Sequence, residues 1–120
     1  MTKFIDWSAL VGYCGLIFWL SAQEKLPVPQ VFDVQDKFMH TAAYFVMGVF
    51  SWRAFQHANL KHSHLAILTI LFCSLYGMSD EWHQSFVSGR SPSAWDWLAD
   101  TVGACLAVGS MQKLRLSKRM

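Results

Sequence analysis

One short segment of this chain carries acidic, basic and imidazole side chains at helical spacing. Lys37, His40 and Tyr44 follow one another at i, i+3 and i+7, and Asp36 stands just before them. Side chains at that spacing lie on one face of a helix. A histidine in the company of carboxylates can transfer protons or bind a metal ion. The segment therefore predicts one wall of a polar site.

Two later segments supply further polar groups. They are Asp80, Glu81 and Gln84 at the end of one apolar run, and Ser93, Asp96 and Asp100 at the start of the next. A carboxylate inside a membrane span costs at least about 2.5 kcal/mol, so it usually faces a bundle interior and has a partner. Lys37, His40 and Arg90 are the available partners. Together these residues form the candidate ligand-binding site.

The basic groups of this set favour an anionic ligand. The Arg90 guanidinium can hold phosphate or carboxylate bidentately, and Lys37 and free N–H groups at a helix start would assist it. His40 and Glu81 are the candidates for a catalytic base, although binding alone requires no catalysis. We expect no cofactor.

Two other kinds of site are weaker alternatives. A metal site could be built from His40, Asp80, Glu81 and Asp96, but the chain has no HExxH or CxxC spacing, so we predict no metal. A serine nucleophile, Ser91 or Ser93 beside His40, lacks a surrounding GxSxG turn.

The elements that must position these residues are apolar segments. The chain is 53% hydrophobic and 15% charged, whereas roughly 25% charged is usual in soluble domains. Residues 41–52 and 65–79 contain no charged side chain, so neither has the polar face of a soluble surface helix. We predict an all-α membrane protein: four short transmembrane helices, at about 7–23, 36–56, 65–82 and 93–112, in a compact bundle that forms a single domain over residues 1–120.

With four spans, both termini lie on the same side of the membrane. That side would hold seven basic residues, Lys3, Arg53, Lys61, Lys113, Arg115, Lys118 and Arg119, and the other side three, Lys25, Lys37 and Arg90. The positive-inside rule predicts cytoplasmic termini, with the polar site at the outer face. The formal charge of +2 and the lack of a basic, aromatic-rich run argue against nucleic acid.

The remaining polar residues have structural interpretations. Asp6 precedes the first predicted helix, and Arg53 can extend its head group to the interface. His57, His62 and His64 fall at the cytoplasmic side and are expected to be solvated loop residues. Cys14, Cys73 and Cys105 lie in apolar segments without paired spacing and are expected to be buried hydrophobic residues.

An ordered set of short motifs resembles the VanZ-like family of small membrane proteins. The matching pieces are Asp36-Lys37-Phe38-Met39-His40 with Tyr44 and Gly48, then Asp80-Glu81-Trp82-His83-Gln84, Gly89-Arg90, Ser93, Asp96 and Ala99 to Gly103. The resemblance implies a bacterial multi-pass membrane protein of a family named after a teicoplanin-resistance protein. The chain departs from that pattern at Ser88, where proline is common, and at Asp100, where asparagine is common.

Three functions are consistent with these observations. The leading hypothesis is an envelope protein that binds a polar or anionic group, such as a lipid-linked or cell-wall precursor, at its outer face, with a link to the glycopeptide antibiotic response. The second is a hydrolase or transferase that acts on a lipid-linked phosphate. The third is a structural partner protein in which the polar cluster only fixes helix packing. The sequence leaves the oligomeric state open.

Overall fold

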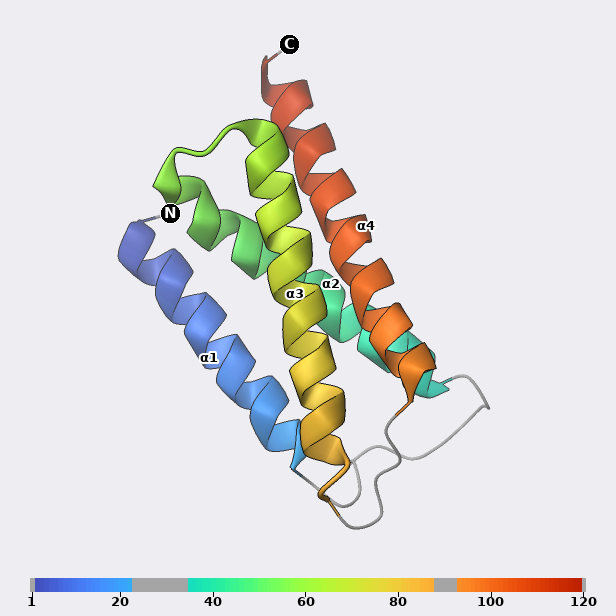
Figure 1. The fold of residues 1–120 in the computed structure, drawn as a ribbon. Coiled ribbons are helices and arrows are strands. Elements are labelled where there is room, and N and C mark those ends of the chain that lie inside the picture. Colours follow the sequence, from blue (N-terminus) through green and yellow to red (C-terminus); the bar gives the residue numbers. More distant parts are fainter. Residues whose placement is uncertain (1, 23–34, 88–92, 120) are drawn as a thin grey trace.

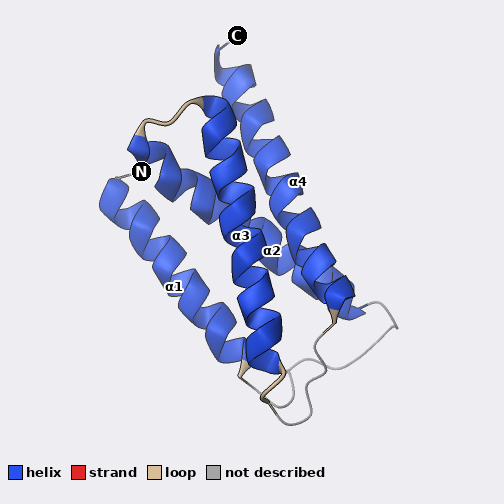
Figure 2. Ribbon diagram, in the orientation of Figure 1, coloured by secondary structure: helices blue, strands red, loops and turns tan. Residues whose placement is uncertain are grey.

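The computed structural model describes residues 2–22, 35–87 and 93–119, and the side chains of these residues except 35, 36 and 115–119. Within those ranges the chain is helical apart from short turns and caps (Figure 2). The elements are α1 (Lys3–Ser21), α2 (Gln35–Phe55), the 3-10 turn η1 (Gln56–Ala58), α3 (His62–Gln84) and α4 (Ala94–Arg119). The predicted all-helical fold with four helices is therefore confirmed.

All four helices differ from their predicted bounds, and α1 and α4 differ most. α1 begins at Lys3, four residues earlier than predicted, because the Thr2 hydroxyl accepts a hydrogen bond from the Ile5 N–H at 3.2 Å and caps the helix. Asp6 therefore lies inside the first turn of α1 and not before it. α4 extends to Arg119, seven residues beyond the predicted end at 112.

The two termini and the α2–α3 connection lie at one end of the bundle, which we call the terminal end (Figure 1). The opposite end, the loop end, holds the C-terminal ends of α1 and α3 and the N-terminal ends of α2 and α4. Consequently α2 and α4 run in the same direction, as the second and fourth helices of an up-and-down bundle must.

The most extensive packing is between α2 and α4, and glycines make it close. A Cβ added to Gly103 would lie 2.2 Å from the Thr41 carbonyl oxygen, and one added to Gly48 would lie 2.6 Å from the Ala107 Cβ. Small residues that let helix backbones approach are typical of helix pairs in membranes. This close packing brings the first turns of α2 directly beside the first turns of α4.

Large apolar side chains cover much of the outer surface. On α1, α3 and α4 the exposed residues include Phe18, Trp19, Leu71, Leu75, Val102 and Leu106, each more than half exposed. By length and composition α1 and α3 could each cross a membrane. The arrangement in which all four helices span the membrane remains a prediction.

Candidate functional site

The loop end gathers polar side chains from all four helices. Those with described side chains come from α1 (Ser21), α2 (Lys37, His40, Tyr44), α3 (Asp80, Glu81, Gln84) and α4 (Asp96, Asp100). Six of them, Ser21, Asp80, Glu81, Gln84, Asp96 and Asp100, are at most 9% exposed. The cluster is therefore built into the interior of the bundle and not spread over its surface.

Two ion pairs connect α2 to α4 across the glycine contact. Lys37 Nζ lies 2.5 Å from Asp96 Oδ1, and His40 Nδ1 lies 2.7 Å from Asp100 Oδ1. His40 Nε2 is also 3.8 Å from Asp96 Oδ2. Lys37 and His40, three residues apart on α2, thus face Asp96 and Asp100, four residues apart on α4, in the same order, because the two helices run in parallel.

The adjacent acids Asp80 and Glu81 face different parts of the molecule. Asp80 accepts hydrogen bonds from the hydroxyls of Ser21 and Tyr44, the latter at 3.3 Å, and so joins α3 to α1 and α2. Glu81 accepts the Ser93 backbone N–H at 2.8 Å, just before α4 begins. Successive side chains on a helix diverge by about 100°, which explains why a consecutive pair serves two neighbours.

A cavity of about 80 Å³ lies between α1, α2 and α3 beside this cluster. Its lining residues are Ile17, Leu20, Ser21, Met39, His40, Ala43, Tyr44, Asp80 and Gln84. On the other side of α3, a hollow of about 340 Å³ is lined by Met78, Glu81, Ser93, Ala94 and Trp97. Both spaces are mostly apolar and each is lined by one carboxylate, Asp80 in the cavity and Glu81 in the hollow, a composition that suits a ligand with a polar group and an apolar chain.

Several predicted site residues fall outside the described parts of the chain. These are Arg90 and Ser91, and also the side chain of Asp36. Ser93 is described, and its hydroxyl accepts the Trp95 N–H at 3.1 Å, which makes it a cap for α4. Ser93 thus acts as a helix cap in the structure, whereas the nucleophile alternative requires its hydroxyl beside His40.

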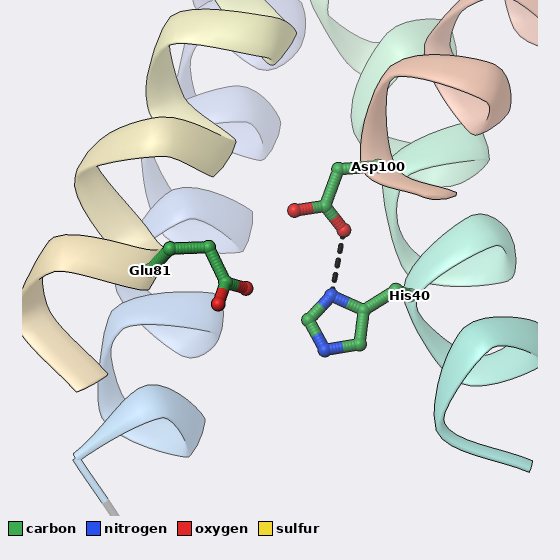
Figure 3. Close-up of side chains that lie close together, drawn as sticks. All are labelled: His40, Glu81 and Asp100. Atoms are coloured by element: carbon green, nitrogen blue, oxygen red, sulfur yellow. Dashed lines mark hydrogen bonds and ion pairs between the residues drawn. The ribbon is translucent and has the colours of Figure 1, made fainter. Parts of the chain in front are cut away.

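The potential metal ligands that the structure brings together differ from the sequence-based set by including Asp100 in place of Asp80 and Asp96. Asp80 is bonded to Ser21, and Asp96 is paired with Lys37. Among the described residues, His40, Glu81 and Asp100 each offer one ligand atom, and these atoms lie within 4.8 Å of one another. Figure 3 shows the three side chains pointing toward one another from α2, α3 and α4.

A second polar cluster, at the terminal end, was not predicted. Asp6, only 1% exposed, lies with its Oδ1 3.3 Å from Arg53 Nε and its Oδ2 2.7 Å from His57 Nε2. The prediction that His57 is a solvated loop residue is wrong, and the Arg53 head group turns toward Asp6 of α1. His62 also departs from that prediction, since it begins α3 with its ring 5.3 Å from that of Trp52.

A signal for this terminal cluster was present in the sequence. Asp6 and Arg53 are opposite charges in two apolar segments that must be neighbours, at positions that the helix directions bring to the same end. Ser21, by contrast, offered no such signal, because a serine at a helix end is common.

Comparisons with known proteins agree with the motif resemblance. No solved structure matches the chain. A curated relative, the uncharacterized protein C11E3.10 of Schizosaccharomyces pombe (strain 972 / ATCC 24843), is 30% identical over 91 residues, which are 75% of this chain. The chain spans about half of that relative, 52% of its length. The model of the VanZ/LLP1 family matches residues 7–115, which include every described residue of both polar clusters except Asp6, and the chain therefore belongs to the VanZ/LLP1 family.

Proposed function

We propose that this protein is a multi-pass envelope membrane protein whose loop end, at the outer face, binds a polar or anionic head group. The apolar outer surfaces of α1, α3 and α4 support insertion in lipid. The seven basic residues expected at the terminal end, against three at the loop end, support cytoplasmic termini. The bacterial inner membrane and a link to the glycopeptide response are parts of this proposal that rest on the family resemblance.

The observation that carries the proposal is the convergence of four carboxylates, a lysine and a histidine beside the cavity at the loop end. Carboxylate oxygens accept hydrogen bonds, so they suit the hydroxyl and amino groups of a saccharide or amine head group. Lys37 and Arg90 are the groups suited to a phosphate. A lipid-linked precursor contains both kinds of group, and its apolar chain would lie against the apolar cavity lining.

The match to a fission yeast protein broadens the ligand class. A similar protein in a fungus fits a lipid-linked polar group in general better than a ligand specific to bacterial cell walls. A cell-wall precursor remains one member of that class.

One observation favours a second candidate function, a hydrolase or transferase for a lipid-linked phosphate. The Asp100 carboxylate lies 2.7 Å from His40 Nδ1, an arrangement that orients an imidazole and leaves its other nitrogen to act as a base. Incubation of the purified protein with an isoprenoid phosphate tests this candidate. Phosphate release by the wild type that His40→Gln abolishes would support it, and equal release by both would contradict it.

Complementation tests the binding proposal. We expect a deletion strain carrying the Glu81→Gln or Lys37→Gln variant to grow like the deletion strain under teicoplanin, while Lys113→Gln restores growth like the wild type. Lys113 is a matched control because it is an exposed lysine on the same helix as Asp96 but near the terminal end. Full complementation by Glu81→Gln and Lys37→Gln, each inserted at wild-type levels, would overturn the proposal.

Topology is tested separately with reporters inserted after Val87 and after Asn59. We expect the first reporter to be active outside and the second in the cytoplasm. A cytoplasmic reporter after Val87 would contradict the outer-face position of the site.

A further inference from the structure

Three helices each contribute one potential metal ligand at the centre of the loop end. His40 on α2, Glu81 on α3 and Asp100 on α4 offer ligand atoms that lie within 4.8 Å of one another (Figure 3). That spacing lets one ion contact all three with small side-chain rotations, since metal–ligand distances are about 2.0–2.3 Å. We propose that His40, Glu81 and Asp100 bind a divalent transition-metal ion.

The burial of Asp100 gives independent support. Its side chain is 0% exposed, and its Oδ2 makes no hydrogen bond to any described residue. Gly77 makes room for this oxygen, because a Cβ at that position would lie 2.8 Å from it. A buried carboxylate oxygen without a partner is costly, and coordination to a cation removes that cost.

The charge balance points in the same direction. With all four carboxylates ionised, the described cluster holds Asp80, Glu81, Asp96 and Asp100 against the ammonium of Lys37, which leaves three net negative charges when His40 is neutral. A divalent cation reduces this excess to one. Lys37 is already paired with Asp96, so it cannot neutralise the deeper Asp100 as well.

The neighbouring acids are engaged in ways that exclude them from the ligand set. Asp80 accepts hydrogen bonds from Ser21 and Tyr44, on the side of α3 that faces α1 and α2. Asp96 lies 2.5 Å from the Lys37 ammonium, whose positive charge would repel a metal ion bound to the same carboxylate. The three proposed ligands are the acidic and imidazole groups whose ligand atoms lie together at the junction of α2, α3 and α4.

The donor set selects the class of metal. One imidazole with two carboxylates suits Mn²⁺, Fe²⁺ or Zn²⁺, whereas Ca²⁺ and Mg²⁺ prefer sites made only of oxygen ligands. Three protein ligands also leave coordination positions open. This inference deepens the proposed function, on which it rests: the open positions would accept an oxygen of an anionic head group in a cluster that is otherwise acidic.

The test uses Mn²⁺ alone and the full-length protein in detergent. We expect electron paramagnetic resonance titration to show one Mn²⁺ per chain, displaced by Zn²⁺, and spin-echo modulation to show a directly bound imidazole nitrogen. His40→Gln, Glu81→Gln and Asp100→Asn should each weaken binding by about 10-fold or more, as loss of a metal ligand or its close support does. Asp6→Asn, which changes a buried carboxylate at the terminal end, should bind Mn²⁺ like the wild type.

Three results would overturn the metal site: no Mn²⁺ or Zn²⁺ binding by the folded wild type at millimolar metal, no nitrogen modulation in the wild type, or unchanged binding in all three variants. The wild-type measurements decide the question even where a variant fails to fold. Lys37→Gln separates this inference from the proposed function, since it should lose complementation and keep Mn²⁺ binding. Metal binding with full complementation by Lys37→Gln would contradict the proposed function and leave the metal site supported.

Discussion

The two polar clusters at opposite ends of the bundle differ in their charge balance. At the terminal end one buried carboxylate, Asp6, contacts two basic side chains, Arg53 and His57. At the loop end four carboxylates are at most 9% exposed, and the described basic partners are Lys37 and His40. The charge of Asp6 at the terminal end is balanced by basic residues, whereas the described side chains of the loop-end cluster include more acidic than basic groups.

This difference indicates what each cluster contributes. The ion pair between Asp6 on α1 and Arg53 on α2 connects the two helices, and the buried carboxylate is neutralised without a ligand. An acidic excess inside the bundle costs stability unless a cation or hydrogen-bond donors from a ligand offset it. We therefore expect the loop-end cluster to bind a ligand and the terminal cluster to stabilise the packing of α1 against α2.

The largest expected effect comes from breaking the terminal cluster. Arg53→Met keeps the aliphatic stem but leaves Asp6 buried with His57 alone, so the free energy of unfolding in detergent should fall by about 3 kcal/mol. Arg53→Lys restores the charge and should recover most of that loss. A change below about 1 kcal/mol for Arg53→Met would show that the terminal cluster is not the structural link described here.

A methyl group added beside Asp100 tests the packing of the loop-end cluster. Gly77→Ala places a Cβ 2.8 Å from Asp100 Oδ2, and overpacking of this kind should lower the free energy of unfolding by about 2 kcal/mol. Gly12→Ala is the matched control, because nothing lies within 4 Å of its added Cβ. The control should be neutral or stabilising by up to about 1 kcal/mol, as Gly→Ala in a helix usually is. Equal effects of the two substitutions would remove the argument that Gly77 makes room for Asp100.

The smallest expected effect concerns the link between α1 and the loop-end cluster. Ser21→Ala removes one of the two hydroxyl donors to Asp80 and leaves Tyr44, so thermal unfolding should report a loss of about 1 kcal/mol. Ser110→Ala serves as control, because its exposed hydroxyl bonds only to the Leu106 carbonyl oxygen within its own helix. A Ser21→Ala loss as large as that of Arg53→Met would mean that the two ends do not differ as proposed.

Much of the helical framework could be predicted because it depends on local patterns. Apolar runs and the Pro27, Pro29 and Pro92 breaks indicate four helices. The i, i+3 spacing placed Lys37 and His40 on one face of α2, where the structure pairs them with Asp96 and Asp100. These features require only helical periodicity and the direction of each segment.

The remaining features depend on packing between helices. Glu81 and Asp80 are neighbours in sequence, and only the positions of α1 and α4 decide that they face apart. Asp6 lies inside α1, and not before it as the apolar run predicts, because the Thr2 hydroxyl caps the helix upstream of that run. The choice of Asp100 over Asp80 and Asp96 as a potential metal ligand likewise depends on which hydrogen bonds the others make.

The glycine contact between α2 and α4 also fixes the axial register of the site. The charges alone would allow α4 to slip along α2 by one turn, about 5.4 Å, since His40 could then pair with Asp96 or Lys37 with Asp100. Steric contacts exclude such a slip, because Gly103 fits against the Thr41 backbone, whereas Ala99 or Ala107 would carry a Cβ into that position. Substitutions of the acidic and basic residues at this end would therefore leave the register unchanged, whereas a larger residue at Gly103 would shift every polar pair at once.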